Sequence, residues 1–231
     1  MDIDEIPTSN EAFSSMLKQA IENNQIEVAK NLIHKHDGIP IEDDIVRASI
    51  YAGSIPIFRT LLAKMPDILN ENHDRRGTTL EIALSSQAPS EFISFLLSEA
   101  GADPKICSGW TLSPLQSAAS FYETPNMVRL LVEHGALVQR SGALALAARK
   151  GRVDTVRLLI ELGEDVNDTG PGLVPVFPAH CAVKYRQLEV LKVLVVHGAN
   201  LDLRDSKDRT VLMLADEMGY KEAISILQGK A

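Results

Sequence analysis

The chain has 231 residues, and its 31 acidic and 23 basic residues give a net charge of −8. An acidic chain is a poor match for a phosphate backbone unless its bases gather on one face, so we expect no binding to nucleic acid. The two cysteines, Cys107 and Cys181, form neither a C-x-x-C pair nor a disulfide framework, so we expect no metal site. Motifs for nucleotides, dinucleotides and zinc hydrolases are also lacking, so no cofactor is expected.

The first residues, MDIDEIPTSNEAF, are acidic and lack the basic and apolar regions of a signal peptide. No apolar run approaches the roughly 18 residues that a membrane helix needs. We therefore expect a cytoplasmic protein without membrane contact, and the sequence leaves a nuclear location open.

Short alanine-rich helical segments recur along the chain, and one alanine marks each of them. It falls at Ala20, Ala48, Ala83, Ala118, Ala147, Ala182 and Ala215, at spacings of 28 to 35 residues. A small residue at a fixed place indicates that two helices approach closely there in every repeat. A single domain, 1–231, is therefore predicted, with an N-terminal cap at 8–39, repeats at 40–74, 75–108, 109–140, 141–172 and 173–206, and a C-terminal cap at 207–231.

A longer helical segment follows each short one. Three of them are near copies, namely MVRLLVEHGALV, TVRLLIELGEDV and VLKVLVVHGANL. Their apolar residues recur at i, i+3, i+4 and i+7, and a glycine follows, which predicts amphipathic helices that end in a left-handed residue.

The segments SPLQSAA, GALALAARKGRVDTVRLLIELGEDVN and TVLMLADEMGY resemble ankyrin repeats. The resemblance is closest from about Arg76 to the C-terminus and weakest in the N-terminal cap, because a cap has one face in water. It implies an all-α ankyrin-repeat solenoid with short β-hairpin fingers, curved so that the first helices and fingers line a concave binding face. It also implies a monomer that binds a protein or peptide partner on that face.

Two fingers are longer than the repeat requires. One lies between Ala102 and Pro114 and carries Trp110, and the other lies between Val166 and His180. The finger between these two, VQRSG, is short. We therefore predict a notch, with Trp110 on one wall, the Val174–Phe177 loop on the other, and the first helix of the repeat at 141–172 as its floor.

The resemblance also places certain side chains on the concave face. The predicted binding residues are aromatic or basic, and they are Tyr51, Trp110, Phe121, Tyr122, Arg149, Lys150, Phe177 and Tyr185. One aromatic residue is more often part of a core than of a site. Aromatic anchors grouped with arginine are typical of a binding hot spot, so we expect the group to bind a partner.

His180 stands at the histidine of the T-P-L-H pattern, which the resemblance gives a structural role. Its usual threonine partner is replaced by Phe177, and other repeats have Glu81, Gln116, Ala145 or Met213 at this place. Cys181 is expected to be a small buried residue, and adjacent helix residues do not face each other, so a Cys–His pair is not expected. His34, His36 and His73 are expected at the surface.

An alternative function remains open, namely a small-molecule pocket in the notch with cofactor-independent acid–base chemistry. Cyclisation, isomerisation or elimination would suit it. The candidates for moving a proton are His180, Tyr122, Tyr185 and Glu81, and Arg149 or Lys150 could hold a carboxylate.

Overall fold

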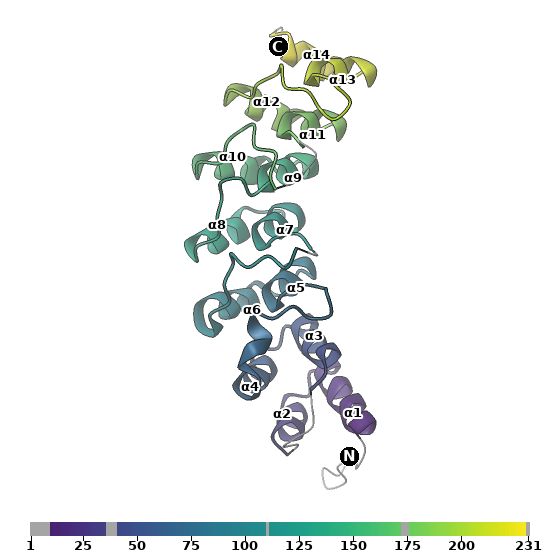
Figure 1. Cartoon of the computed structure of the whole chain (residues 1–231), viewed down its shortest axis with the longest axis vertical. Helices are drawn as coiled ribbons and strands as arrows, with labels where there is room; N and C mark the ends of the chain where they lie inside the picture. Colours follow the sequence, from purple (N-terminus) through teal and green to yellow (C-terminus); the bar gives the residue numbers. More distant parts are fainter. Residues whose placement is uncertain (1–9, 36–40, 110, 172–175, 230–231) are drawn as a thin grey trace. The chain divides into compact units, whose positions relative to one another are not determined.

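The computed structural model describes residues 10–35, 41–109, 111–171 and 176–229. Within these residues the chain is helical and contains no strand. Its contacts divide the chain into an N-terminal unit, Met1–Leu112, and a C-terminal unit, Ser113–Ala231. Figure 1 shows that each unit is a series of antiparallel helix pairs, as the recurring alanine predicts.

The N-terminal unit consists of three helix pairs. They are α1 (Asn10–Glu22) with α2 (Ile26–Lys35), α3 (Asp43–Ala52) with α4 (Ile55–Lys64), and α5 (Thr79–Ser85) with α6 (Ser90–Phe95). A 3-10 turn, Pro66–Leu69, follows α4, and a π-helical turn, Leu96–Ala100, follows α6. The first helices stack in the order α1, α3, α5, and α2 packs on α4.

The C-terminal unit consists of four helix pairs. They are α7 (Pro114–Phe121) with α8 (Asn126–Glu133), α9 (Ala143–Lys150) with α10 (Val153–Glu161), α11 (Pro178–Lys184) with α12 (Leu188–Val196), and α13 (Val211–Glu217) with α14 (Lys221–Leu227). The first helices form one layer, in the order α7, α9, α11, α13, and α10, α12 and α14 contact one another in a second layer.

The recurring alanines lie where the sequence predicts, between stacked helices. All seven are buried, and four of them, Ala83, Ala147, Ala182 and Ala215, expose no surface. A larger side chain at these places would push neighbouring first helices apart, because packed interiors leave no space for added atoms. Leucine, isoleucine and valine of the first and second helices together supply most of the remaining core.

The fingers differ from the β-hairpins that the sequence predicts, because no ladder forms among the described residues. Two fingers are tight turns whose ends are joined by a backbone bond. The N–H of His73 donates to the carbonyl of Gly77 at 3.0 Å, and the N–H of Asp205 donates to the carbonyl of Arg209 at 2.9 Å. The chain reverses within five residues at both places, which leaves no length for a second rung. None of the described helices combines the length and the apolar character needed to span a membrane.

Candidate functional site

His180 is buried in the C-terminal unit and bonds to the next repeat. Its Nε2 lies 2.9 Å from the backbone carbonyl of Arg209, which can only accept, so Nε2 is the donor. Phe177 lies against the imidazole, with ring centroids 5.5 Å apart. The phenyl ring thus takes the place of the expected threonine, and the structural role predicted for His180 agrees with these contacts.

Two other repeats make the same kind of bond from the same place. Glu81 accepts from the backbone N–H of Ser108 at 3.1 Å, and Gln116 donates to the carbonyl of Ser141 at 2.9 Å. Each side chain also completes a capping box at the start of its helix, with Thr78 or Ser113 as the N-cap residue. Both oxygens of Glu81 are therefore occupied by structural bonds.

The repeat at 141–172 has Ala145 at this place, and other contacts hold its first helix against its own finger. Gly142 and Gly170 approach so closely that a Cβ added to Gly170 would lie 2.6 Å from the Cα of Gly142. The carboxylate of Asp168 accepts from the N–H of Gly142 at 3.1 Å and of Gly170 at 3.0 Å. These bonds hold the long finger against the start of α9.

Glu164 lies beside this contact, where other repeats have alanine (Ala102, Ala136 and Ala199). Its side chain is buried, and Oε2 accepts from the hydroxyl of Ser141 at 2.8 Å, whereas Oε1 is buried without a donor. Burial raises the pKa of Glu164 to about 7, and the nearby carboxyl of Asp168 adds to the rise. A proton on Glu164 would allow it to donate to Asp168.

A basic and aromatic patch lies at the ends of α9 and α11, whose helices contact each other. We define the α9–α11 patch as Arg149, Lys150, Lys184 and Tyr185, all of them exposed. The guanidinium carbon of Arg149 lies 4.8 Å from the centroid of the Tyr185 ring, and Nζ of Lys184 lies 5.6 Å from it. No hydrogen bond or ion pair joins these three cations to a carboxylate of the described residues.

Cations near a helix C-terminus are favoured by the helix dipole, and this accounts for part of the pattern. The dipole does not account for the exposed aromatic ring that two cations flank. Cys181 lies beneath the patch, and burial raises the pKa of its thiol to about 11 despite the charges of Lys184 and Arg149. It is therefore a buried thiol, as the sequence predicts.

The other predicted site residues do not all join this patch. Phe121 and Tyr122 are half-buried at the end of α7, and the hydroxyl of Tyr122 is buried without a partner. Burial raises the pKa of Tyr122 to about 12. Trp110 and two residues of the second wall, Val174 and Pro175, lie outside the described residues, so the predicted notch remains a prediction.

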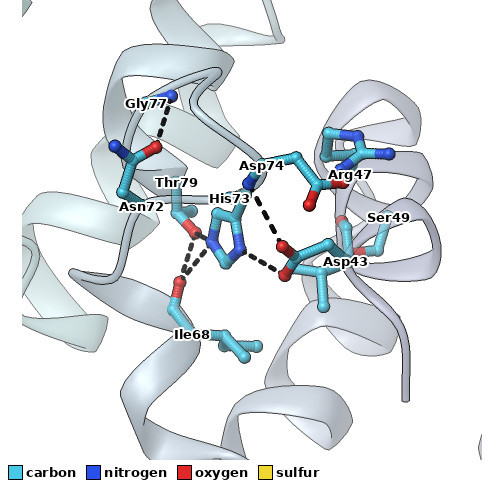
Figure 2. A network of polar contacts seen from close by, with 10 residues as sticks. Asp43, Arg47, Ser49, Ile68, Asn72, His73, Asp74, Gly77 and Thr79 are labelled. Carbon is cyan, nitrogen blue, oxygen red and sulfur yellow. Dashed lines mark hydrogen bonds and ion pairs between the residues drawn. The ribbon is translucent and has the colours of Figure 1, made fainter. Parts of the chain in front are cut away.

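Tyr51 lies in the N-terminal unit, where it lines a cavity of about 500 Å³ between α1 and α3. The neighbouring finger is held by His73, shown in Figure 2, whose Nε2 lies 2.8 Å from the carbonyl of Ile68 and whose Nδ1 lies 3.1 Å from the carboxylate of Asp43. The side chain of His73 is 1% exposed, so the expectation that it lies at the surface is wrong. The sequence offers one clue to this buried role, because His73 lies in the turn that precedes the pair Thr78-Thr79. Its partner Asp43, however, is 30 residues away in the sequence.

Comparison with known proteins agrees with this architecture. A family model for three ankyrin repeats matches residues 80–170, and a model for a single ankyrin repeat matches residues 177–206. Together they cover more than half of the chain. The chain belongs to the ankyrin repeat family, whose members are typically protein–protein interaction modules.

The chain is similar to mouse ankyrin repeat and SOCS box protein 11, with 38% identity over 87 residues, which are 37% of this chain and 26% of that protein. It is also similar to a probable E3 ubiquitin-protein ligase, XBOS34, of Oryza sativa subsp. japonica, with 30% identity over 87 residues, 38% of this chain and 17% of that protein. The matched part thus spans about a quarter or less of these relatives.

Two solved structures show the same fold. The ankyrin repeat domain of human ASB11 aligns with a TM-score of 0.74 and 22% identity, covering 91% of this chain and 96% of that domain. The ankyrin repeat domain of Bcl-3 aligns with a TM-score of 0.61 and 20% identity, covering 94% of this chain and 86% of that domain.

Proposed function

We propose that this ankyrin-repeat chain binds a protein partner on the layer of first helices, the face expected to be concave, and that the α9–α11 patch receives an acidic segment of that partner. The observation that carries the proposal is the placement of Arg149 and Lys184 beside the exposed ring of Tyr185, with the exposed Lys150 next to Arg149 at the end of α9. The chain as a whole is acidic, with a net charge of −8, so three cations without carboxylate partners are not a general property of its surface.

The chemistry of the patch defines the partner segment. A carboxylate can pair with Arg149 or Lys184, and charge-assisted hydrogen bonds to Arg are the strong ones. An apolar side chain beside that carboxylate can cover the ring of Tyr185, because tyrosine offers a large rigid contact area. An acidic residue next to an apolar one in an extended or helical segment meets both needs.

The proposed test is affinity capture with the full chain, read by mass spectrometry for proteins and small molecules together. Arg149→Ala and Tyr185→Ala should each reduce the captured partner by at least about tenfold, as hot-spot residues do. Arg157→Ala is the matched control, because Arg157 is an exposed arginine on α10 in the second layer of the same unit. Equal capture by all three variants contradicts the proposal.

Salt provides an independent check of the same binding event. Charge pairing at an exposed patch is screened as the ionic strength rises, since the Debye length falls from about 10 Å at 0.1 M to about 3 Å at 1 M. Capture by the native chain should weaken over this range. Capture by the Arg149→Ala variant should weaken less.

The acid–base alternative draws little support from its candidates. His180 is 7% exposed and Glu81 is 1% exposed, and both are engaged in bonds between repeats. Tyr122 has a buried hydroxyl, and only Tyr185 is exposed among the four. A small molecule captured by the native chain and lost with Tyr185→Ala would favour this alternative over a protein partner.

The relatives named as ubiquitin ligases suggest a context for the binding role. The matched segment is 17% of XBOS34 and 20% of the putative ligase XBAT34 of Arabidopsis thaliana, so ligase activity is not carried over to this chain. We propose for this chain the recognition of a partner, as a monomer in the cytoplasm. Light scattering and cell fractionation test the last two points.

A further inference from the structure

The cavity in the N-terminal unit is independent of the α9–α11 patch and is formed by other helices. Its volume of about 500 Å³ lies within the range of small-ligand sites, roughly 300–1,000 Å³. Lys18 of α1 and Arg47, Ala48 and Tyr51 of α3 line it, as does Arg76 of the following finger.

Two of the three cations that line the cavity already have carboxylate partners. Nζ of Lys18 lies 3.0 Å from Oδ2 of Asp44, and Arg47 pairs with Asp74 of the finger. The side chain of Arg76 is exposed, and no hydrogen bond or ion pair joins its guanidinium group to another described residue. Arg47 lowers the pKa of Asp74 by a hydrogen bond, and the charge of Arg76 contributes to a smaller extent.

The finger that carries Arg76 is held in place by the network of Figure 2. The N–H of Arg76 donates to the carbonyl of His73 at 2.9 Å, and the N–H of Gly77 donates to the side chain of Asn72 at 3.1 Å. His73 itself is buried against Asp43 of α3. The backbone of Arg76 is therefore fixed before any ligand arrives, which lowers the entropic cost of binding.

A further feature of the cavity points to the kind of ligand. Tyr51 is 52% exposed, which is a large apolar surface for a single residue. The cavity thus presents an unpaired cation beside an exposed aromatic ring.

We infer that this cavity binds an acidic residue of an extended peptide together with its apolar neighbour. The side-chain carboxylate pairs with Arg76, and the apolar neighbour covers the ring of Tyr51. A phosphate is a poorer match, because the carboxylates of Glu22 and Asp44 also line the cavity and would repel a dianion.

The test uses the full chain, labelled with nitrogen-15, and the peptide acetyl-Leu-Glu-Leu-N-methylamide as the probe. Its glutamine analogue and inorganic phosphate are the comparisons. The amides of Ala48, Tyr51 and Ala52 should shift and saturate with the glutamate peptide, whereas the glutamine analogue should bind at least about fivefold more weakly. Equal binding of the two peptides, or tighter binding of phosphate, overturns the inference.

Two variants locate the site. Arg76→Gln and Tyr51→Ala should each weaken the glutamate peptide at least about fivefold, while Arg75→Gln, which removes the same charge from the same finger outside the cavity lining, should not. An unchanged amide spectrum elsewhere in the N-terminal unit shows that each variant is folded. Full binding by Arg76→Gln overturns the inference, and because both residues lie outside the α9–α11 patch, the outcome is separate from that of the proposed function.

Discussion

The Nε2 atom of His180 lies 2.9 Å from the carbonyl of Arg209, a main-chain atom 29 residues further along the chain. Glu81 and Gln116 reach Ser108 and Ser141 in the same manner from the same place in their repeats. Three side chains of different chemistry therefore perform one task, which is to connect the start of a first helix to the backbone of the next repeat. Stability in a repeat protein depends on such contacts between neighbours.

His180→Ala should lower the free energy of unfolding by about 1–3 kcal/mol, because it removes a donor and leaves the carbonyl of Arg209 with one bond fewer. His180→Gln should retain most of the stability, since Gln116 makes the equivalent bond in its own repeat. Urea unfolding followed by circular dichroism measures both variants. A glutamine variant as unstable as the alanine variant would show that the imidazole acts through packing on Phe177 instead.

Glu164 should make the stability of the chain depend on pH near neutrality. Its pKa is raised from 4.5 to about 7 by burial and by Asp168, so between these values the folded state binds more protons than the unfolded state. The contribution of Glu164 to stability is therefore complete below pH 4.5 and is lost as the pH rises through 7. The loss should be about 2 kcal/mol, as a shift of one pKa unit corresponds to about 1.4 kcal/mol and the site is partly screened by solvent.

Glu164→Gln should abolish most of this dependence, because an amide can donate to Asp168 at any pH. At pH 8 the variant should be more stable than the native chain, and at pH 5 the two should be similar. Thermal unfolding at both pH values provides the comparison. Parallel stability profiles for the two proteins would mean that Glu164 is charged in the folded state throughout.

Gly170→Ala should destabilise the C-terminal unit by more than the usual cost of alanine at a positive φ. Gly170 has a φ of 70°, and the added Cβ would lie 2.6 Å from the Cα of Gly142. Gly198→Ala is the control, since Gly198 has a φ of 83° and nothing lies within 4 Å of its Cβ position. We expect a difference of about 1–3 kcal/mol between the variants in urea unfolding, because overpacking forces backbone movement. Equal effects would count against a tight contact.

His73→Ala should destabilise the N-terminal unit by about 2–4 kcal/mol, as expected when a buried hydrogen-bond network is broken. In the variant, the carbonyl of Ile68 accepts a hydrogen bond only from the hydroxyl of Thr79, and the carboxylate of Asp43 loses its contact with the imidazole. Amide hydrogen exchange should rise first in the finger at Asp74–Gly77. A finger that keeps its native protection would show that the turn is stable without the histidine.

Much of the fold could be predicted from the sequence because the same helix pair is repeated along the chain. The alanine series located each helix pair, since close helix approach allows only a small side chain. The finger conformation was predicted less well, because turns of five residues depend on individual hydrogen bonds. His73 was missed for the same reason. The segment that contains it, AKMPDILNENHD, departs from the repeat, and the partners of His73 become visible only in three dimensions.

The candidate site was predicted in part. The sequence placed Arg149, Lys150 and Tyr185 together, because the two positions after the alanine pair fall at the ends of neighbouring first helices. Lys184 occupies one of the same two positions but is not among the predicted binding residues. Tyr51 was predicted to lie near the same concave-face positions, and in the structure it lines a cavity of the N-terminal unit.

In all three links between repeats, the distant atom belongs to the main chain: the N–H of Ser108 and the carbonyls of Ser141 and Arg209. Every amino acid supplies a carbonyl, and every one except proline supplies an N–H. The identity of the side chain at the receiving end is therefore irrelevant to the link. Side chains at these three receiving residues can therefore change, and with them the surface that a partner meets, without removing the link between repeats.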